Sequence, residues 1–288
     1  MIEALKAILF GIVEGITEWL PVSSTGHMIL LNEFVRLDVT ESFYDLFEMV
    51  IQLGAILAVI VLFFHKLNPF SKKKSPERKK ETWSLWLKVI VAALPSAIIG
   101  LAIDEVLDGY LRNTFLNGVS LNAIVVAAML VLYGVLFILV EKKNKGKALA
   151  VVNVGQIDYK TALIIGAFQC LSIIPGTSRS GATILGALLV GVSRSAGAEF
   201  SFFLAIPTML GASGLKVLLY AKDILSEEAP MPSGVELGVL ALGCIVAFLI
   251  SLTVIKGLME YVRKHSFSAF GVYRIILGVV VLLFFLLR

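Results

Sequence analysis

The chain reads Pro21-Val-Ser-Ser-Thr-Gly26 near the middle of one apolar region, residues 2–36, and Pro175-Gly-Thr-Ser-Arg-Ser-Gly181 near the middle of another, residues 159–192. Each half of these regions is shorter than the ~20 apolar residues that an α-helix needs to cross a bilayer. Proline and glycine interrupt helices, and non-helical backbone at membrane depth survives only inside protein or beside a water-filled cavity. The two breaks therefore predict two re-entrant helical hairpins.

The rest of the chain has the composition of a membrane protein. Of its 288 residues, 58% are hydrophobic and 16% are charged, whereas soluble domains average about 45–50% and about 25%. Six further apolar stretches are long enough to span a bilayer. They lie near residues 43–65, 84–104, 118–140, 197–221, 235–258 and 268–287. We predict an all-α polytopic membrane protein with six transmembrane helices and two re-entrant helical hairpins.

The positions of the charges are more informative than the net charge of +4. Lysine and arginine gather in three connecting segments, residues 66–82, 141–158 and 259–267, while the segments 105–117 and 222–234 carry few cations. Cytoplasmic loops of membrane proteins are enriched in lysine and arginine. We therefore expect the three basic segments in the cytoplasm, and we interpret the densest as a loop rather than as a nucleic-acid patch.

The two broken regions resemble each other when one is shifted by 155 residues, without a gap. The shift pairs Gly11 with Gly166, Glu14 with Gln169, Ser23 with Ser178, Gly26 with Gly181, Ile29 with Ile184 and Leu30 with Leu185. Chance is the alternative explanation, because glycine and serine are common in membrane helices. Three spans separate the regions, so a true repeat is an inverted one whose broken tips meet within the membrane.

The predicted organisation follows from this repeat. We expect a single integral membrane domain over residues 1–288. Its first repeat covers about 1–117, its second covers about 155–270, and a final helix occupies 268–288. Folds of this kind place their binding sites where the broken segments meet.

Two carboxylates, Glu14 and Glu18, lie four residues apart in the helix that leads into the first break. On a helix this spacing places their Cβ atoms about 5–6 Å apart on one face. Neighbouring carboxylates in an apolar segment repel each other and are unfavourable to desolvate. One of them could face solvent or pair with a basic residue. Alternatively, a divalent cation between them, or a proton on one of them, relieves the repulsion.

The first break offers three hydroxyl groups, on Ser23, Ser24 and Thr25, and then His27. We expect one of the three to cap the following helix. The N-terminus of that helix presents free N–H groups and a positive dipole, which suit a phosphate. His27 follows Ser24 by three residues, so on a helical turn its ring could reach that hydroxyl. The alternative is a histidine that only packs, with its hydrogen bonds satisfied.

Arg179 lies in the second break, where an arginine is unfavourable unless it has an anionic partner. The partner is either a carboxylate, Glu14 or Glu18, or a substrate phosphate, for which the guanidinium fork has the right geometry. The two are compatible if a carboxylate holds Arg179 until substrate arrives. Neighbouring groups would complete an anion-binding loop, namely Ser178, Ser180, Thr183 and the N–H groups from Gly176 to Gly181.

The motifs at residues 14–27 and 175–183 resemble the two signature motifs of the bacterial undecaprenyl-diphosphate phosphatases, the bacitracin-resistance family. The similarity covers the whole chain in length, hydropathy and order of spans, and neither motif departs from the family pattern. It implies hydrolysis of undecaprenyl diphosphate to undecaprenyl phosphate and inorganic phosphate, which recycles the lipid carrier of cell-wall synthesis and gives bacitracin resistance. It also implies a divalent cation, Mg²⁺ or Ca²⁺.

By this resemblance, Glu14 and Glu18 form an acidic motif, where we expect the metal, and Glu18, Ser24, His27 and Arg179 belong to the catalytic centre. Together with the loop chemistry above, it assigns substrate binding to Ser23, Thr25, Gly176, Ser178, Ser180 and Thr183. The expected partners are a polyprenyl diphosphate and membrane lipids, without nucleic acid, and a homodimer is left open. We expect a multi-pass protein of the bacterial plasma membrane whose active site opens to the outer face.

Transport is the alternative function. Inverted repeats with broken helices and charges at the bilayer midplane are common in secondary transporters. On that interpretation the protein is a polyprenyl-phosphate flippase or an ion-coupled transporter, and Glu14, Glu18 and Arg179 bind an anion or couple ions without hydrolysis.

Overall fold

The computed structural model describes residues 1–116, 119–147 and 150–287, and most of these residues are helical. Within them, six helices are long and apolar enough to cross a membrane, as the sequence predicts. They are α3 (Glu41–Leu62), α5 (Pro76–Asn113), α6 (Leu121–Asn144), α9 (Arg194–Leu225), α10 (Gly234–Lys264) and α11 (Ser268–Leu287). The chain is therefore an all-α, multi-pass membrane protein.

The other elements are short. Four helices flank the two breaks, and they are α1 (Ile2–Thr17), α2 (Ser24–Phe34), α7 (Tyr159–Gln169) and α8 (Arg179–Leu189). The 3₁₀ turn η2 (Cys170–Ile173) continues α7 towards the second break. The connections hold α4 (Phe64–Leu67), η1 (Val154–Gln156) and a two-stranded antiparallel pair, β1 (Phe115–Leu116) and β2 (Val119–Ser120).

The helix α5 is longer than the predicted span 84–104, with 38 residues. It begins early because the Ser75 side chain accepts the N–H of Arg78 and because Pro76 occupies the first turn, where a missing N–H is harmless. The predicted span is thus the apolar centre of a helix that continues beyond it at both ends.

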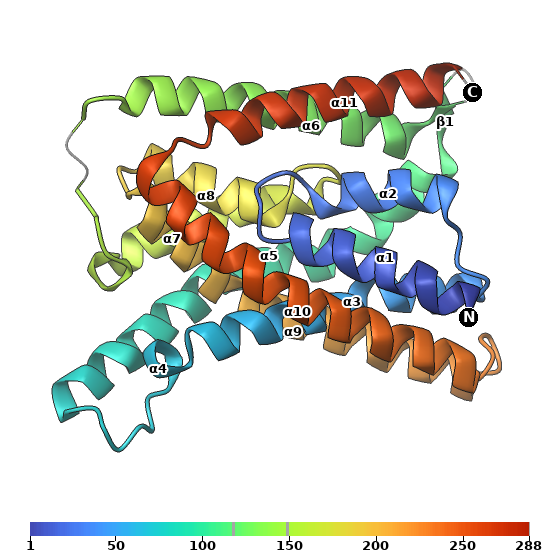
Figure 1. Ribbon diagram of the computed structural model, residues 1–288, viewed down its shortest axis with the longest axis horizontal. Helices are drawn as coiled ribbons and strands as arrows, with labels where there is room; N and C mark the ends of the chain where they lie inside the picture. Colours follow the sequence, from blue (N-terminus) through green and yellow to red (C-terminus); the bar gives the residue numbers. More distant parts are fainter. Residues whose placement is uncertain (117–118, 148–149, 288) are drawn as a thin grey trace.

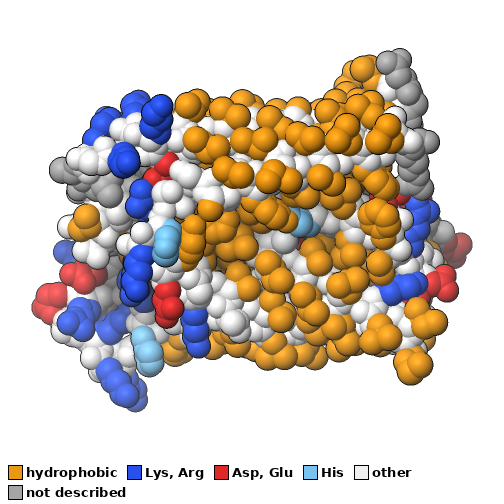
Figure 2. All heavy atoms as spheres, turned by 45° about the horizontal axis from the view of Figure 1, so that its top comes forward, with side chains coloured by type: hydrophobic (Ala, Val, Ile, Leu, Met, Phe, Trp, Pro, Cys, Tyr) orange, Lys and Arg blue, Asp and Glu red, His pale blue; other side chains and the backbone are white. Residues whose placement is uncertain are grey.

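On the face shown in Figure 2, an apolar band crosses the middle of the molecule, and most of the lysine and arginine side chains lie at one end of it. The three predicted basic segments lie at the corresponding end of the ribbon, where α4, the connection from α6 to α7 and the junction of α10 and α11 are found (Figure 1). The basic segments therefore share one end of the molecule, as the alternation of loop charges predicts.

The two broken regions form helical hairpins that point towards each other (Figure 1). The arms α1 and α2 have 16 and 11 residues and start from the end that holds the N-terminus. The arms α7 and α8 have 11 residues each and start from the opposite end. Each arm is shorter than the ~20 residues of a full span. Their re-entry into a bilayer stays a prediction.

Each hairpin packs closely against a long helix from the other half of the chain. A Cβ atom on Gly11 of α1 would lie 2.8 Å from the carbonyl oxygen of Gly243 in α10. A Cβ atom on Gly166 of α7 would lie 2.1 Å from the carbonyl oxygen of Ala92 in α5. Gly11 and Gly166 form one of the pairs that align when the first broken region is shifted by 155 residues onto the second. The hairpins are therefore held in similar ways, and the division of the chain into two repeats stays a prediction.

Candidate active site

The two breaks lie next to each other in the interior. The hydroxyl of Ser180 contacts the carbonyl oxygens of Glu18 at 3.2 Å and Leu20 at 3.3 Å, so a residue of the second break binds the backbone of the first. Ser180 is almost completely buried. The two breaks therefore form one junction, although its contacting residues are separated by 162 positions in the sequence.

Glu18 is the centre of a short hydrogen-bonded chain at this junction. Its Oε1 accepts from Nη2 of Arg179 at 2.7 Å, and its Oε2 accepts from the Ser24 hydroxyl at 2.8 Å. The side chains of Glu18 and Arg179 are only 8% and 14% exposed, so water screens their attraction weakly. The structure thus brings together three of the four residues that the sequence assigns to catalysis.

Serine caps the helix after each break. Ser23 accepts the N–H of Gly26 and precedes α2, and Ser178 accepts the N–H of Gly181 and precedes α8. Both serines have positive φ values, 72° and 69°, which for a residue other than glycine disfavours the backbone by about 1–2 kcal/mol. The prediction that one hydroxyl of the first break caps its helix is confirmed.

This geometry makes Ser24 and Arg179 the first residues of α2 and α8. The N–H groups in the first turn of a helix have no intrahelical partner and carry its positive dipole. Two such N-termini converge on Glu18 through Ser24 and Arg179. The junction can therefore stabilise additional negative charge, such as that of a phosphate.

Gly176 gives the second break its shape. Its φ is +86°, and a Cβ atom there would lie 2.6 Å from both the Cα and the carbonyl oxygen of Val126 in α6. We predict that Gly176→Ala lowers the free energy of unfolding by roughly 2–5 kcal/mol, from backbone strain and overpacking together. Thermal unfolding in detergent measures the change. Gly211→Ala is the control, since no atom lies within 4 Å of a Cβ there, and an unfolding temperature equally unaffected in both variants would contradict the prediction.

His27 lies near the junction but does not hydrogen-bond to Ser24, so the expected contact between them is wrong for this structure. Its Nδ1 lies 2.7 Å from the carbonyl oxygen of Ser23, and its Nε2 lies 2.6 Å from the hydroxyl of Tyr273. Because a carbonyl only accepts, Nδ1 carries a proton, and in the neutral ring Nε2 accepts from Tyr273. The Ser24 hydroxyl has Glu18 as its acceptor instead.

The sequence analysis missed two neighbouring residues of α11, Tyr273 and Arg274. The Tyr273 ring stacks on His27, with the ring planes 5° apart and the centroids 5.6 Å apart. Arg274 donates to the carbonyl oxygens of Pro21 and Thr177, one in each break. An arginine within an otherwise apolar membrane helix is a signal in its own right, and Arg274 could have been singled out on that ground.

Glu14 lies one helical turn before Glu18 and is almost completely buried, at 1% exposure. Its Oε1 has no hydrogen-bond partner among the described residues. A buried carboxylate oxygen is unfavourable unless a cation or a hydrogen-bond donor satisfies it. The described residues contain no cluster of three or more His, Cys, Asp or Glu side chains suited to a metal. The unpartnered oxygen of Glu14, one helical turn from Glu18, is thus the feature among the described residues that a bound cation would satisfy.

The other predicted substrate ligands differ in how accessible they are. Thr25 is exposed and Ser178 is half-buried. Thr183 is fully buried, and its hydroxyl lies 2.6 Å from that of Ser201 and 2.9 Å from the carbonyl oxygen of Arg179. In this structure Thr183 thus supports α8 and α9, and its contact with a phosphate stays a prediction.

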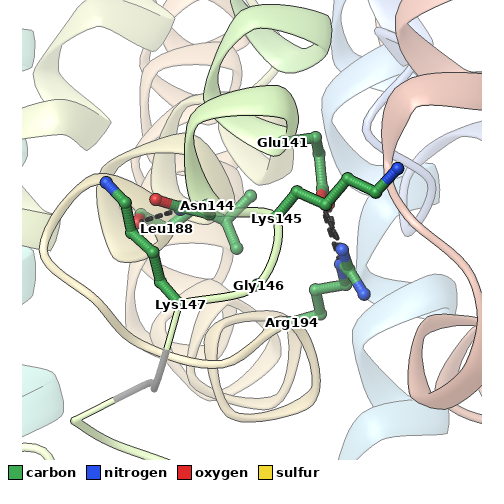
Figure 3. A pocket seen from close by; sticks show the side chains of 7 residues that line it. All are labelled: Glu141, Asn144, Lys145, Gly146, Lys147, Leu188 and Arg194. Atoms are coloured by element: carbon green, nitrogen blue, oxygen red, sulfur yellow. Dashed lines mark hydrogen bonds and ion pairs between the residues drawn. The ribbon is translucent and has the colours of Figure 1, made fainter.

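A separate pocket of about 220 Å³ lies beside the C-terminal end of α6, away from the junction (Figure 3). Arg194 of α9 donates from Nε and Nη2 to the carboxylate of Glu141. The backbone N–H of Phe267 also donates to Glu141. These contacts connect the C-terminal end of α6 to the start of α9 and to the residue before α11.

Comparison with known proteins gives consistent matches over almost the entire chain. Residues 7–280 match the family model described as bacitracin resistance protein BacA. The chain is 55% identical to an undecaprenyl-diphosphatase of Enterococcus faecalis over 284 residues, which are 98% of this chain and 97% of the relative. It is 52% identical to undecaprenyl-diphosphatase 1 of Clostridioides difficile over 287 residues, which are 100% of this chain and 98% of the relative. The similarity therefore includes both breaks and every helix that contributes to the junction.

Proposed function

The chain belongs to the bacitracin resistance protein BacA family, and from this premise we propose that it hydrolyses undecaprenyl diphosphate to undecaprenyl phosphate and inorganic phosphate at the junction of its two breaks. We place the active site there because the two carboxylate oxygens of Glu18 accept hydrogen bonds from Arg179 and Ser24. Arg179, the proposed phosphate-binding group, and Ser24, the proposed nucleophile, thus both hydrogen-bond to Glu18. Bacitracin resistance follows from recycling of the lipid carrier.

Binding begins with the terminal phosphate of the lipid. Its oxygens replace Glu18 at part of the Arg179 guanidinium and take up the free N–H groups at the starts of α2 and α8. These donors also stabilise the charge that develops on the transferring phosphoryl group. The isoprenoid tail stays in the lipid, next to the apolar band on the surface of the protein (Figure 2).

Ser24 is the nucleophile in the mechanism that the geometry favours. Its oxygen forms a bond to the terminal phosphorus as the bond from phosphorus to the bridging oxygen breaks, and its proton passes to Glu18 Oε2, 2.8 Å away. Undecaprenyl phosphate leaves, and water then attacks the phosphoserine and releases inorganic phosphate. Direct attack by water, with Ser24 only binding the phosphate, is the alternative mechanism.

A divalent cation, Mg²⁺ or Ca²⁺, is a proposal that rests on Glu14. The buried, unpartnered Oε1 of Glu14 and the carboxylate of Glu18 would hold it together with substrate oxygens. The cation would neutralise charge on the diphosphate and on the leaving phosphate.

We predict that the purified protein in detergent releases inorganic phosphate from undecaprenyl diphosphate and that a chelator abolishes the release. Detergent micelles provide no second compartment, so phosphate release separates hydrolysis from the alternative of transport. Adding back Mg²⁺ or Ca²⁺ should restore the rate. A protein that is stably folded but releases no phosphate with either cation would exclude the proposed function, and release that persists in chelator would exclude the metal.

We predict that Ser24→Ala lowers kcat by more than about 10³-fold, as loss of a nucleophile does in comparable mechanisms, and that no phosphoserine is trapped. Acid quenching of the wild type with labelled substrate, followed by peptide mass spectrometry, detects the phosphoserine. Ser226→Ala removes a hydroxyl that bonds only to its own helix, at Lys222 and Asp223, and should leave the rate unchanged. Substantial turnover by Ser24→Ala would favour direct attack by water.

We also propose an orientation and a cellular location for the protein. The excess of lysine and arginine at one end of the molecule supports a cytoplasmic location for that end. Undecaprenyl carriers serve cell-wall synthesis, which supports the bacterial plasma membrane as the site of action. We place the opening of the active site towards the outer face, and labelling of single cysteines near Thr25 from either side of the membrane tests this placement.

A further inference from the structure

Arg274 joins the two breaks although it belongs to neither of them. Its Nη1 donates to the carbonyl oxygen of Pro21 at 3.2 Å, and its Nη2 donates to those of Gly176 at 2.8 Å and Thr177 at 3.0 Å. A fourth, longer contact of 3.4 Å reaches Met129 of α6. A single side chain of α11 therefore binds the backbone of both loops that form the active site.

The geometry of these contacts needs a guanidinium group. The donors of arginine diverge in one plane from a rigid fork, whereas a lysine ammonium is a single point at the end of a flexible chain. Only the two terminal nitrogens of Arg274 reach the carbonyls, and they do so on two separate segments. Gly181 leaves room for the group, because a Cβ atom there would lie 3.1 Å from Nη1 of Arg274.

The charge of Arg274 has no carboxylate partner among the described residues, although the side chain is completely buried. Its acceptors are neutral carbonyls, and its Nε has no hydrogen-bond partner in the part of the chain that the structure describes. A buried, unpaired cation in a membrane protein is unfavourable and typically marks a functional region. Because Arg274 is 0% exposed, it does not touch the substrate, and any effect on the reaction passes through the loops that it holds.

We propose that Arg274 is a positioning residue for the hydrolysis, since it fixes residues 18–26 and 174–181 in the register that joins Glu18 to Arg179 and Ser24. The proposal rests on the proposed function for its catalytic consequence. Its structural part, the tie between the two loops, rests on the three hydrogen bonds to Pro21, Gly176 and Thr177. Loss of the tie lets the loops shift relative to each other while the six spans remain packed.

The experiment compares Arg274→Lys and Arg274→Gln with the wild type in two measurements. Hydrogen–deuterium exchange in detergent should become faster in residues 18–26 and 174–181 together. The kcat for phosphate release should fall about 10²-fold, because a misplacement of about 1 Å can have an effect of this size, while KM changes much less. Gly181→Ala, which crowds the guanidinium, is a milder variant that should show the same pattern if the Arg274 variants fail to fold.

Arg194→Lys is the matched control, because Arg194 is a partly buried arginine whose partner Glu141 lies away from the junction. It should leave exchange in both loops and kcat unchanged. Exchange that is unchanged in the loops of the folded Arg274 variants overturns the proposal, and so does a loss of activity that only follows a general loss of stability. If the wild type released no phosphate, the proposed function would fail, but the exchange measurement would still decide whether Arg274 ties the loops.

Discussion

Arg179→Lys should release phosphate from undecaprenyl diphosphate about 10²–10³-fold more slowly than the wild type, the usual effect of removing a donor that stabilises a transition state. In the structure Nη2 of Arg179 donates to Glu18 at 2.7 Å, and Nη1 donates to the carbonyl oxygen of Ser201 at 3.3 Å. A lysine has one nitrogen and cannot bind Ser201 while it also offers a planar pair of donors to a phosphate. Arg179→Lys therefore keeps the positive charge but loses the planar pair of donors that would bind a phosphate.

Initial rates at several substrate concentrations, with thermal unfolding of the same samples, measure the effect. Arg179→Ala should lose at least as much activity, and both variants should insert and fold, because α8 has many other buried contacts. Arg194→Lys again serves as the control at an ion pair outside the junction. Rates near the wild-type value for both Arg179 variants would contradict the assignment of the site.

Glu18→Gln should lower kcat by about 10²–10⁴-fold, the range expected for loss of a general base. The carboxylate accepts from Ser24 through one oxygen and from Arg179 through the other. A glutamine has nearly the same size, but its amide cannot take the serine proton, and its nitrogen offers no acceptor to either partner. Steady-state rates across the pH range, with and without added cation, measure the loss.

A double variant separates the two roles of Glu18. If Glu18 acts as the base for Ser24, Glu18→Gln should cause little further loss in a Ser24→Ala background, because residues that act as a unit are not additive. Fully additive losses would show that Glu18 acts elsewhere, for example on the cation. Glu199→Gln is the control carboxylate, since Glu199 pairs with Lys66 and not with any residue of the breaks.

The general architecture could be predicted because its causes are local in the sequence. Spans are recognised by length and hydropathy, and the hairpins by Pro21 and Pro175 within apolar regions. An anionic partner for Arg179 could also be predicted, because an arginine is unfavourable in an apolar segment without one. The sequence left Glu14, Glu18 and a substrate phosphate open, and the structure shows Glu18. The boundaries of α5 differed from the prediction because capping at Ser75, and not hydropathy, sets its start.

The partner of His27 could not be predicted, since Tyr273 lies 246 positions away in the sequence. A helical spacing favoured Ser24, but that argument considers only one helix, and the tertiary structure offers the ring another acceptor and donor. The acceptors of Arg274 could not be predicted either, because they are backbone carbonyls that any residue carries. The sequence shows that the charge of Arg274 is unfavourable within an apolar helix, and only the fold shows which carbonyl oxygens accept its hydrogen bonds.

The position of α11 has a consequence for biogenesis. Ribosomes make the chain from its N-terminus, and the helices enter the membrane in that order. Every residue assigned to catalysis precedes α11, yet the tie between the loops comes from Arg274 within it. On the proposed role of Arg274, a nascent chain carries these side chains before the tie can form, so we expect phosphate release to stay slow until α11 has been inserted.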